Sequence, residues 1–235
     1  MALLDELNSK VDEYVTTRWE TPPKASVVPT AENLTLGNTG KVLDACVLYA
    51  DIHRSTEMVD DLIPELAAEY YKAFLYCSAR IIKSNNGEIT AYDGDRVMAV
   101  FIGEDQADRA VISAMQINYA VMFIINPKFQ TTYTNSHKPL KHTVGIDCGE
   151  MLVSKVGVRV DSDLVWVGSA SNYAAKLNSF ETLKIEYSTR ITQEVFNKLS
   201  NRTLFGGDKQ MMWDGTHDAL GKKLHYRSRY YMPVT

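Results

Sequence analysis

The sequence predicts an α+β fold in which a mixed β-sheet is covered by helices. Strand-like and helix-like segments alternate along most of the 235 residues, which is typical of a sheet packed under helices. Turn signals at Asp93-Gly94 and at residues 148–150 predict two hairpins, and hairpins join antiparallel strands. A purely parallel sheet is therefore excluded. We expect an N-terminal helix and connector, residues 1–40, followed by one main domain, residues 41–235.

Composition narrows the class of protein. The formal net charge of −4 gives no electrostatic signal for nucleic acid. Since no run approaches the roughly 18 apolar residues that a membrane span requires, and the acidic start lacks signal-peptide features, we expect a cytoplasmic protein without a membrane span. Cys46, Cys77 and Cys148 are widely spaced in apolar surroundings, which predicts reduced core cysteines.

The N-terminal residues 3–19 have the periodicity of an amphipathic helix. Apolar residues recur at Leu3, Leu4, Leu7, Val11 and Val15. Prolines and polar residues over positions 20–40 predict a connector. The helix either supports a dimer or caps the fold, and the sequence leaves both alternatives open.

The main domain begins with a mostly apolar strand over residues 41–52. A period of two places Val47, Tyr49 and Asp51 on one face of this strand. After it we expect helices over 54–59 and 62–84, a hairpin of strands 88–92 and 96–102, a helix over 105–126 that Pro127 ends, and a polar loop over 129–139.

The second half of the chain predicts more strands than helices. We expect a hairpin of strands 141–147 and 151–157, a strand over 164–168, a helix from Ser169 or Ser171 to Leu177, a strand over 184–187, a helix over 192–199 and two strands between 211 and 232.

Asp51 and Asp95 are the strongest candidates for a functional site, because each lies at a strand end beside a turn. Divalent cations such as Mg²⁺ or Mn²⁺ bind one or two protein carboxylates together with substrate phosphates. The backbone carbonyl of Ile52 is a further candidate ligand, and the amides around Ser55 and Thr56, at a predicted helix start, are candidates for binding a polyphosphate. Taken alone, each Asp is more often a helix cap or a turn residue, but their joint spacing favours a cation site.

Four motifs, in order, resemble one known family, the class III nucleotidyl cyclases. Tyr49-Ala50-Asp51-Ile52-x-x-x-Thr56 is similar to F-A-D-I-x-x-F-T, and residues 94–101 are similar to G-D-x-x-M-A-V-F. Residues 142–149 resemble the G-I-x-x-G hairpin of the family, and Gly168-x-x-x-Asn172-x-Ala174-x-Lys176 resembles G-x-x-x-N-x-A-x-R. The resemblance covers roughly residues 41–232. It implies a ferredoxin-like cyclase catalytic domain.

The resemblance also implies a reaction and a partner. A homodimer would join Asp51 and Asp95 of one chain to Asn172 and Lys176 of the other, with two divalent cations, Mn²⁺ or Mg²⁺, at each site. The reaction would convert a nucleoside triphosphate into a 3′,5′-cyclic monophosphate and diphosphate. Asn172 would orient the ribose, and Lys176 would stabilise developing charge.

Three positions depart from the family pattern. The family arginine is Lys176 here, which is a point charge in place of a planar fork. The family's two purine-reading positions correspond to Ala91 and Val165, which cannot hydrogen-bond a purine through their side chains. A different base, or a different set of reading residues, is implied.

This pattern is similar to the pyrimidine cyclases of bacterial antiphage defence, in which a cyclic nucleotide triggers a separate effector protein. The resemblance implies that uridine triphosphate, in preference to cytidine triphosphate, is the substrate. Tyr49 and Arg96 are candidates for contacting the pyrimidine; the alternatives are core packing for Tyr49 and a surface ion pair for Arg96. Strand alternation argues against Arg96, because it should point away from Asp95.

Two other functions stay open. One is an adenylate cyclase that reads its base with atypical residues, and the other is a non-catalytic nucleotide-binding module, which Lys176 favours. Retention of Asp51, Asp95 and Asn172 argues against the second. Lys222 and Lys223 would either reach the triphosphate, as a family lysine does, or lie in a solvated turn.

Overall fold

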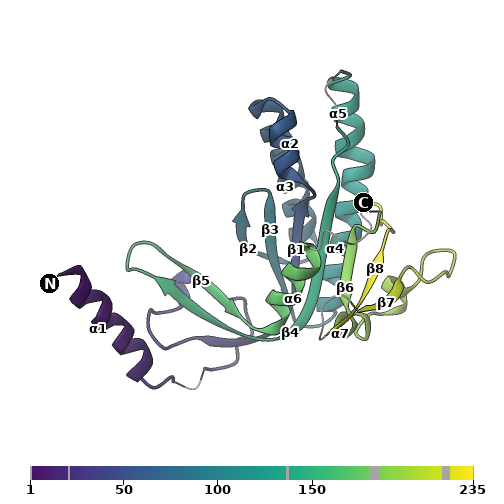
Figure 1. Cartoon of the computed structure of the whole chain (residues 1–235). Helices are drawn as coiled ribbons and strands as arrows, with labels where there is room; N and C mark the ends of the chain where they lie inside the picture. The colour runs from purple at the N-terminus through teal and green to yellow at the C-terminus, as the bar shows by residue number, and fades with distance from the viewer. Residues whose placement is uncertain (1, 21, 136–137, 180–185, 219–222, 235) are drawn as a thin grey trace. The chain divides into compact units, whose positions relative to one another are not determined.

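The computed structural model describes residues 2–20, 22–135, 138–179, 186–218 and 223–234 (Figure 1). It contains two compact units. The smaller unit consists of residues 1–44 and 150–168, and the main unit consists of residues 45–149 and 169–235. Strands β1 (Lys41–Ile52) and β4 (His142–Gly157) each contribute residues to both units.

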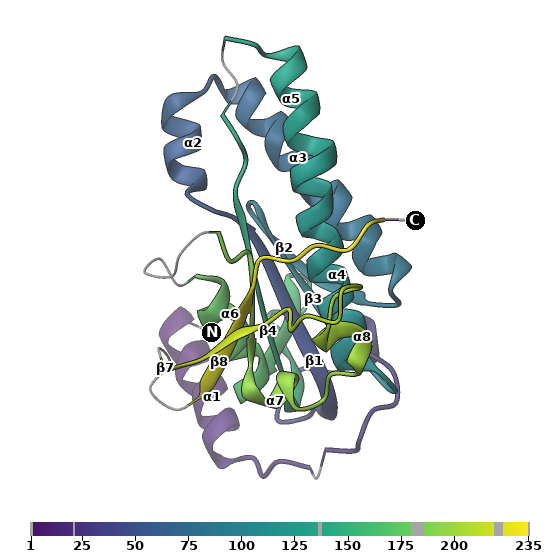
Figure 2. The ribbon, with the colours of Figure 1, turned by 90° about the vertical axis from the view of Figure 1, so that its right-hand side faces the viewer.

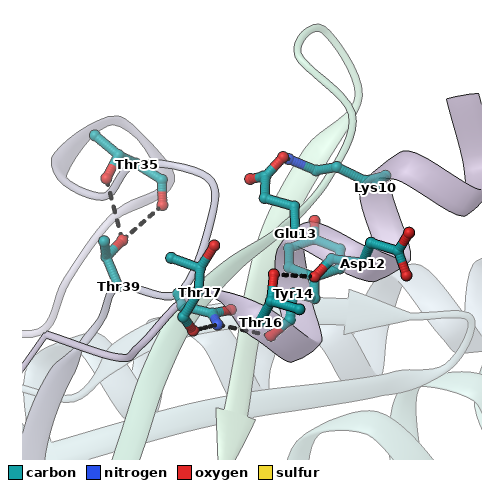
Figure 3. Close-up of polar contacts among 9 residues, drawn as sticks. Lys10, Asp12, Glu13, Tyr14, Thr16, Thr17, Thr35 and Thr39 are labelled. Carbon is teal, nitrogen blue, oxygen red and sulfur yellow. Dashed lines mark hydrogen bonds and ion pairs between the residues drawn. The ribbon is translucent and has the colours of Figure 1, made fainter.

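The smaller unit contains helix α1 (Leu3–Thr16), a short 3-10 turn (Ala31–Asn33) and strand β5 (Ser162–Val167), which pairs with the second half of β4. The Asn38 side chain ties the connector to the end of α1 by donating to the backbone oxygens of Tyr14 and Thr17, at 2.8 and 2.7 Å. Figure 3 shows the surrounding polar contacts, including Lys10 with Glu13. No residue of α1 is buried.

The main unit is built on a mixed sheet, as the sequence predicts. The strand order is β2-β3-β1-β4-β6-β8-β7, with β5 added to β4. Strands β4 and β6 are parallel, whereas β1 and β3, β2 and β3, β6 and β8, and β7 and β8 are antiparallel pairs. The strands not yet bounded are β2 (Glu88–Asp93), β3 (Arg96–Ile102), β6 (Thr189–Thr192), β7 (Asp214–Asp218) and β8 (Leu224–Ser228).

Two long helices, α3 (Pro64–Ser84) and α4 (Gln106–Ala120), pack side by side (Figure 2). They share one hydrophobic core with the face of β1 that carries Cys46, Leu48 and Ala50. Tyr49 and Asp51 alternate with these residues and therefore lie on the opposite face of β1. The remaining helices are α2 (Ser55–Asp61), α5 (Asn126–Thr132), α6 (Ser169–Asn178), α7 (Gln193–Phe196) and α8 (Asn201–Leu204).

The prediction that Pro127 ends a helix is wrong. A π-helical turn, Val121–Ile125, joins α4 to α5, which continues to Thr132 (Figures 1 and 2). Pro127 occupies the first turn of α5, where its missing N–H is tolerated. The resulting helix, residues 106–132, is long and apolar enough to cross a membrane, and 61% of its most apolar stretch is buried inside the fold. That burial is typical of a core helix.

The predicted hairpin at residues 148–150 is also wrong. Those residues stay extended inside the single strand β4, and the chain reverses between Gly157 and Ser162 instead. The strand expected over 184–187 lies at Thr189–Thr192; residues 184 and 185 are outside the described ranges. The cysteine prediction needs a correction too, because Cys46 and Cys148 form a disulfide, with Cα atoms 4.0 Å apart, while Cys77 is free.

Candidate functional site

Two carboxylates lie together at one end of the sheet. Asp51 is next to the last residue of β1, and Asp95 follows Gly94 in the turn between β2 and β3. Gly94 has a φ of 61°, a backbone conformation that glycine adopts without steric cost. Burial and the neighbouring charge of Asp95 raise the pKa of Asp51 to about 7. The hairpin turn therefore brings the two predicted metal ligands close enough to repel each other.

Each carboxylate has one oxygen without a partner. Oδ1 of Asp51 and Oδ2 of Asp95 are buried and form no hydrogen bond within the described structure. A buried polar atom is costly to leave unpaired, and a bound cation would remove that cost. Among the described residues, no group of three or more His, Cys, Asp or Glu residues could hold an ion. The pair thus fits a divalent cation that a phosphate helps to coordinate.

Ile52, the third predicted ligand, directs its side chain into the core with 3% exposure. Its backbone hydrogen-bonds the Asp51 carboxylate, which opposes the rise in the Asp51 pKa. The chain then leaves the sheet as the backbone N–H of His53 donates to the Lys141 carbonyl at 2.9 Å. The backbone of Ile52 is therefore next to the Asp51 carboxylate.

Tyr49 and Arg96 lie together beside the carboxylates. Tyr49 faces Met98 across the β1–β3 pairing and donates its hydroxyl to the Met98 sulfur at 3.0 Å. The Arg96 guanidinium lies over the Tyr49 ring, 5.4 Å from its centroid, and donates to Asp93 at 2.6 Å. The Arg96 charge also lowers the pKa of Asp51, partly offsetting burial and Asp95.

Strand alternation therefore does not keep Arg96 away from the carboxylates. Ala50 faces Val97, so the next pair along the two strands brings Arg96 opposite Asp51. Residues opposite each other in an antiparallel pair point to the same face of the sheet. Arg96 reaches the site through its partner strand rather than through its neighbour in sequence. It also forms an ion pair with Asp93, which is the alternative to base contact that the sequence left open.

Ser55 and Thr56 begin α2, a helix of seven residues. Arg54 precedes them with a φ of 56°, and its guanidinium lies 3.4 Å from Glu57. Tyr71 of α3, which the sequence reading missed, hydrogen-bonds Ser55, and burial is the main cause of its raised pKa. The charges of Asp95 and Asp51 raise that pKa further, so α3 contributes a hydroxyl near the predicted site.

Asn172 and Lys176 lie one helical turn apart on α6, and both are exposed. Residues four apart share a helix face. In the described part of the chain, neither forms a hydrogen bond or an ion pair with Asp51 or Asp95. Within the described part of one chain, the carboxylate pair and the two α6 residues are thus not joined by direct polar contacts.

Asn178 links α6 to the carboxylates of its own chain. Its side-chain nitrogen donates to Asp51 at 3.4 Å, and its backbone oxygen accepts from the Thr143 hydroxyl at 2.8 Å. The sequence reading missed Asn178, whose only signal was a polar residue at the predicted end of a helix. Gly145 of β4 makes a close approach to the same helix, since a Cβ there would lie 2.6 Å from the Asn178 nitrogen.

Lys223 is not a solvated turn residue. Its ammonium pairs with the buried Asp147 at 2.7 Å and with Glu194 at 3.4 Å, and its side chain is only 13% exposed. Thr192 also donates to the Asp147 carboxylate. Lys222 lies outside the described residues.

Comparisons with known proteins agree with this geometry. The profile of the family described as the adenylate and guanylate cyclase catalytic domain matches residues 39–217. A uridylate cyclase of Xanthomonas perforans is 44% identical over 98% of this chain and 98% of its own length. A uridylate cyclase of Burkholderia cepacia is 43% identical over 94% of this chain and 95% of its own length. The crystal structure of the guanylyl cyclase Cya2 has a TM-score of 0.66 at 19% identity, covering 80% of this chain and 92% of that chain, and thus has the same fold.

Proposed function

This chain belongs to the adenylate and guanylate cyclase catalytic domain family and is a nucleotidyl cyclase, and from that premise we propose that it is a uridylate cyclase. It would convert uridine triphosphate into 3′,5′-cyclic uridine monophosphate and diphosphate. The observation that carries the choice of base is the identity of 44% and 43% to two uridylate cyclases over nearly their whole lengths. The apolar residues Ala91 and Val165 support it, because neither side chain offers a hydrogen-bonding group to a purine.

Asp51, Asp95 and the carbonyl of Ile52 would hold the divalent cations. The unpaired oxygens of the two carboxylates support this assignment, since ligation would satisfy both. When bound, Mn²⁺ or Mg²⁺ lowers the pKa of a coordinated hydroxyl and neutralises phosphate charge. The triphosphate would bind beside Ser55 and Thr56, which begin α2 three and four residues after the end of β1.

Asn172 and Lys176 would act on the carboxylate pair of a partner chain in a homodimer. Their exposure on one face of α6 supports this, because exposed polar side chains are available to a second subunit. Asn172 would hold the ribose with its 3′-oxygen in line with the α-phosphorus. The oxygen–phosphorus bond forms as the bond to the bridging oxygen breaks; diphosphate leaves with that electron pair, and the hydroxyl proton passes to water. Lys176 would stabilise the negative charge that develops.

Tyr49 and Arg96 would read the base. The Tyr49 ring offers an aromatic face for a pyrimidine, while the Arg96 guanidinium supplies donors for the carbonyl oxygens at its O2 and O4 positions. The ion pair with Asp93 would hold Arg96 in place. Uracil has two carbonyl acceptors where cytosine has one, so a donor-rich reader favours uracil.

The proposed biological role is second-messenger synthesis in antiphage defence. Cyclic uridine monophosphate made in the cytoplasm would act on a separate effector protein that responds to cyclic nucleotides. If so, cells that carry this enzyme should accumulate the cyclic nucleotide after phage infection, and cells that carry Asp51→Asn should not. An equal amount in both strains would contradict the role.

The enzymatic proposal is tested by incubating the pure protein with each of the four ribonucleoside triphosphates and Mn²⁺, then separating the products by chromatography. Cyclic uridine monophosphate should be the main cyclic product. A main product of cyclic AMP would show instead that a purine is read by atypical residues. No cyclic product from any triphosphate would favour a non-catalytic nucleotide-binding module.

A further inference from the structure

A lysine in the place of the family arginine creates a positioning problem. An arginine presents a rigid planar fork, whereas the Lys176 ammonium sits at the end of a flexible four-carbon stem. Lys176 is exposed, and within the described residues its ammonium has no carboxylate partner. A charge that is to meet a developing phosphate charge works best when its position is set beforehand. Some neighbouring group should therefore restrict this side chain.

The Tyr173 ring is that neighbour. The Lys176 ammonium lies 5.0 Å from the centroid of the ring, within the range of a cation–π interaction. The two residues are three positions apart on α6, which places them side by side on the helix surface. Tyr173 is half-buried, so its ring is less free to move than an exposed tyrosine.

A second ammonium fixes the ring from another element. Lys223, just before β8, lies 4.9 Å from the same centroid. Its own position is set by Asp147, whose side chain is fully buried, at 2.7 Å, and by Glu194 at 3.4 Å. The two carboxylates neutralise the charge of Lys223, which leaves Lys176 as the ammonium at this ring without an anionic partner among the described residues.

We propose that Tyr173 is a positioning residue that holds the Lys176 ammonium for catalysis, with the Lys223–Asp147 ion pair holding the ring. The inference rests on the proposed function, because it assumes that Lys176 meets the triphosphate. This arrangement would position the charge of Lys176 in the absence of the planar guanidinium group that the family arginine provides. It also gives Lys223 a role through the ring rather than through direct contact with phosphate.

Removal of the ring should lower kcat and leave KM nearly unchanged, because Lys176 acts on charge that develops during the reaction. Tyr173→Leu should reduce kcat for uridine triphosphate about 3- to 10-fold, the range expected for a cation–π contact. Tyr173→Phe, which keeps the aromatic face, should retain most of the activity. In a Lys176→Ala background, Tyr173→Leu should change kcat by less than about 2-fold, since the residue it positions is gone.

Tyr14→Leu, in helix α1 of the smaller unit, is the matched control, because Lys10 lies 5.0 Å from the Tyr14 ring centroid (Figure 3). It removes the same kind of contact at the same distance and should leave kcat unchanged. A loss of kcat in Tyr14→Leu equal to that in Tyr173→Leu would show a general effect of removing a tyrosine, and would overturn the inference.

A spectroscopic measurement separates this inference from the proposed function. In protein labelled with ¹³C at lysine Cε, the Lys176 signal is identified by its absence from Lys176→Arg. A ring-current shift should displace it in the wild type and in Tyr173→Phe, but not in Tyr173→Leu. An unchanged Lys176 signal in Tyr173→Leu, or equal kinetic losses with and without Lys176, would overturn the inference while cyclic product still forms. Absence of cyclic product from the wild type would instead overturn the proposed function, and with it the catalytic role of Tyr173.

Discussion

Asn178, at the end of α6, donates a hydrogen bond to Asp51, near the end of β1, at 3.4 Å. The helix that carries Asn172 and Lys176 is therefore anchored to the carboxylate site of its own chain. Its exposed catalytic candidates remain available to another chain.

Because α6 packs closely against β4, a single added methyl group on β4 should lower both stability and activity. Gly145→Ala should displace α6, because the added Cβ would clash with the backbone oxygen of Ala174 and lie 2.6 Å from the backbone nitrogen of Asn178. Overpacking of this kind costs about 1–3 kcal/mol of stability. We expect a lower melting temperature and at least a roughly 10-fold loss of cyclase activity, as a displacement of catalytic groups causes. Thermal unfolding and product formation measure the two effects.

Gly149→Ala is the matched control on the same strand. Its added Cβ would meet the Ser169 hydroxyl at 3.8 Å and Ala170 at 3.9 Å, which is ordinary van der Waals contact. It should keep the activity and the melting temperature of the wild type. If both glycine variants behave alike, the close approach of β4 to α6 does not position the helix.

The carboxylate pair predicts opposite effects on activity and on metal-free stability. Asp51→Asn and Asp95→Asn should each abolish turnover, because the cation loses a ligand. Without metal, each variant should be at least as stable as the wild type, because one of two repelling carboxylates is removed. Mn²⁺ should raise the melting temperature of the wild type alone. A Mn²⁺-dependent rise of equal size in Asp51→Asn would contradict the ligand assignment.

The Tyr49–Arg96 pair predicts a change in substrate choice. Loss of the ring in Tyr49→Ala should lower kcat/KM for uridine triphosphate about 5- to 150-fold, because base stacking contributes about 1–3 kcal/mol. Arg96→Ala should reduce the preference for uridine over cytidine triphosphate, because donors to the carbonyl groups are lost. Steady-state kinetics with both substrates measure this preference. Arg80→Ala, on the exposed surface of α3, is the control; an unchanged preference in Arg96→Ala would exclude Arg96 as a reader.

The lowered pKa of the buried His142 should make the folded protein less stable in acid. Complete burial, and secondly the positive charge of Arg190, lowers the pKa of His142 to about 3, against 6.5 for the unperturbed side chain. The unfolded chain therefore binds a proton more readily than the folded chain. This contribution to the free energy of unfolding is fully present above pH 6.5 and falls, by a few kcal/mol at most, as the pH decreases towards about 3.

Urea unfolding at pH 7 and at pH 4.5 measures this effect. The decrease in the free energy of unfolding between the two pH values should be smaller in His142→Leu than in the wild type. Decreases of equal size would show that other groups, such as His225, whose pKa is also lowered, account for the acid sensitivity.

Much of the fold could be predicted from the local pattern of apolar, polar and turn residues, and the wrong predictions of element ends also have local causes. The alternation over residues 41–52 predicts β1 to the residue, and Asp93-Gly94 predicts the turn that presents Asp95. Pro127 led to the wrong prediction of a helix end, because a π-helical turn precedes it. The periodicity of apolar residues does not reveal such a turn. Gly149 led to the wrong prediction of a hairpin at residues 148–150, because a glycine is also compatible with an extended strand. The strand β4 continues through it.

Site residues that belong to a sequence motif were predictable, whereas residues that reach the site only through the fold were not. Asp51 and Asp95 come from motifs, and the structure places them together. Arg96 opposite Asp51, Asn178 on Asp51 and Lys223 at the Tyr173 ring depend on strand register and tertiary packing. Side-chain pairs of this kind cannot be predicted from a single sequence, because the two residues are far apart in the chain and follow neither the helical nor the strand periodicity.

We propose that each active site for cyclic uridine monophosphate synthesis joins Asp51 of one chain to Lys176 of another, and mixed dimers test this most directly. Asp51→Asn and Lys176→Ala, each nearly inactive alone, are mixed in equal amounts and allowed to exchange subunits. Half of the dimers should then be mixed, and each of these has one intact site, so about a quarter of the wild-type rate should return. No recovery of cyclic uridine monophosphate synthesis, despite demonstrated subunit exchange, would contradict the claim.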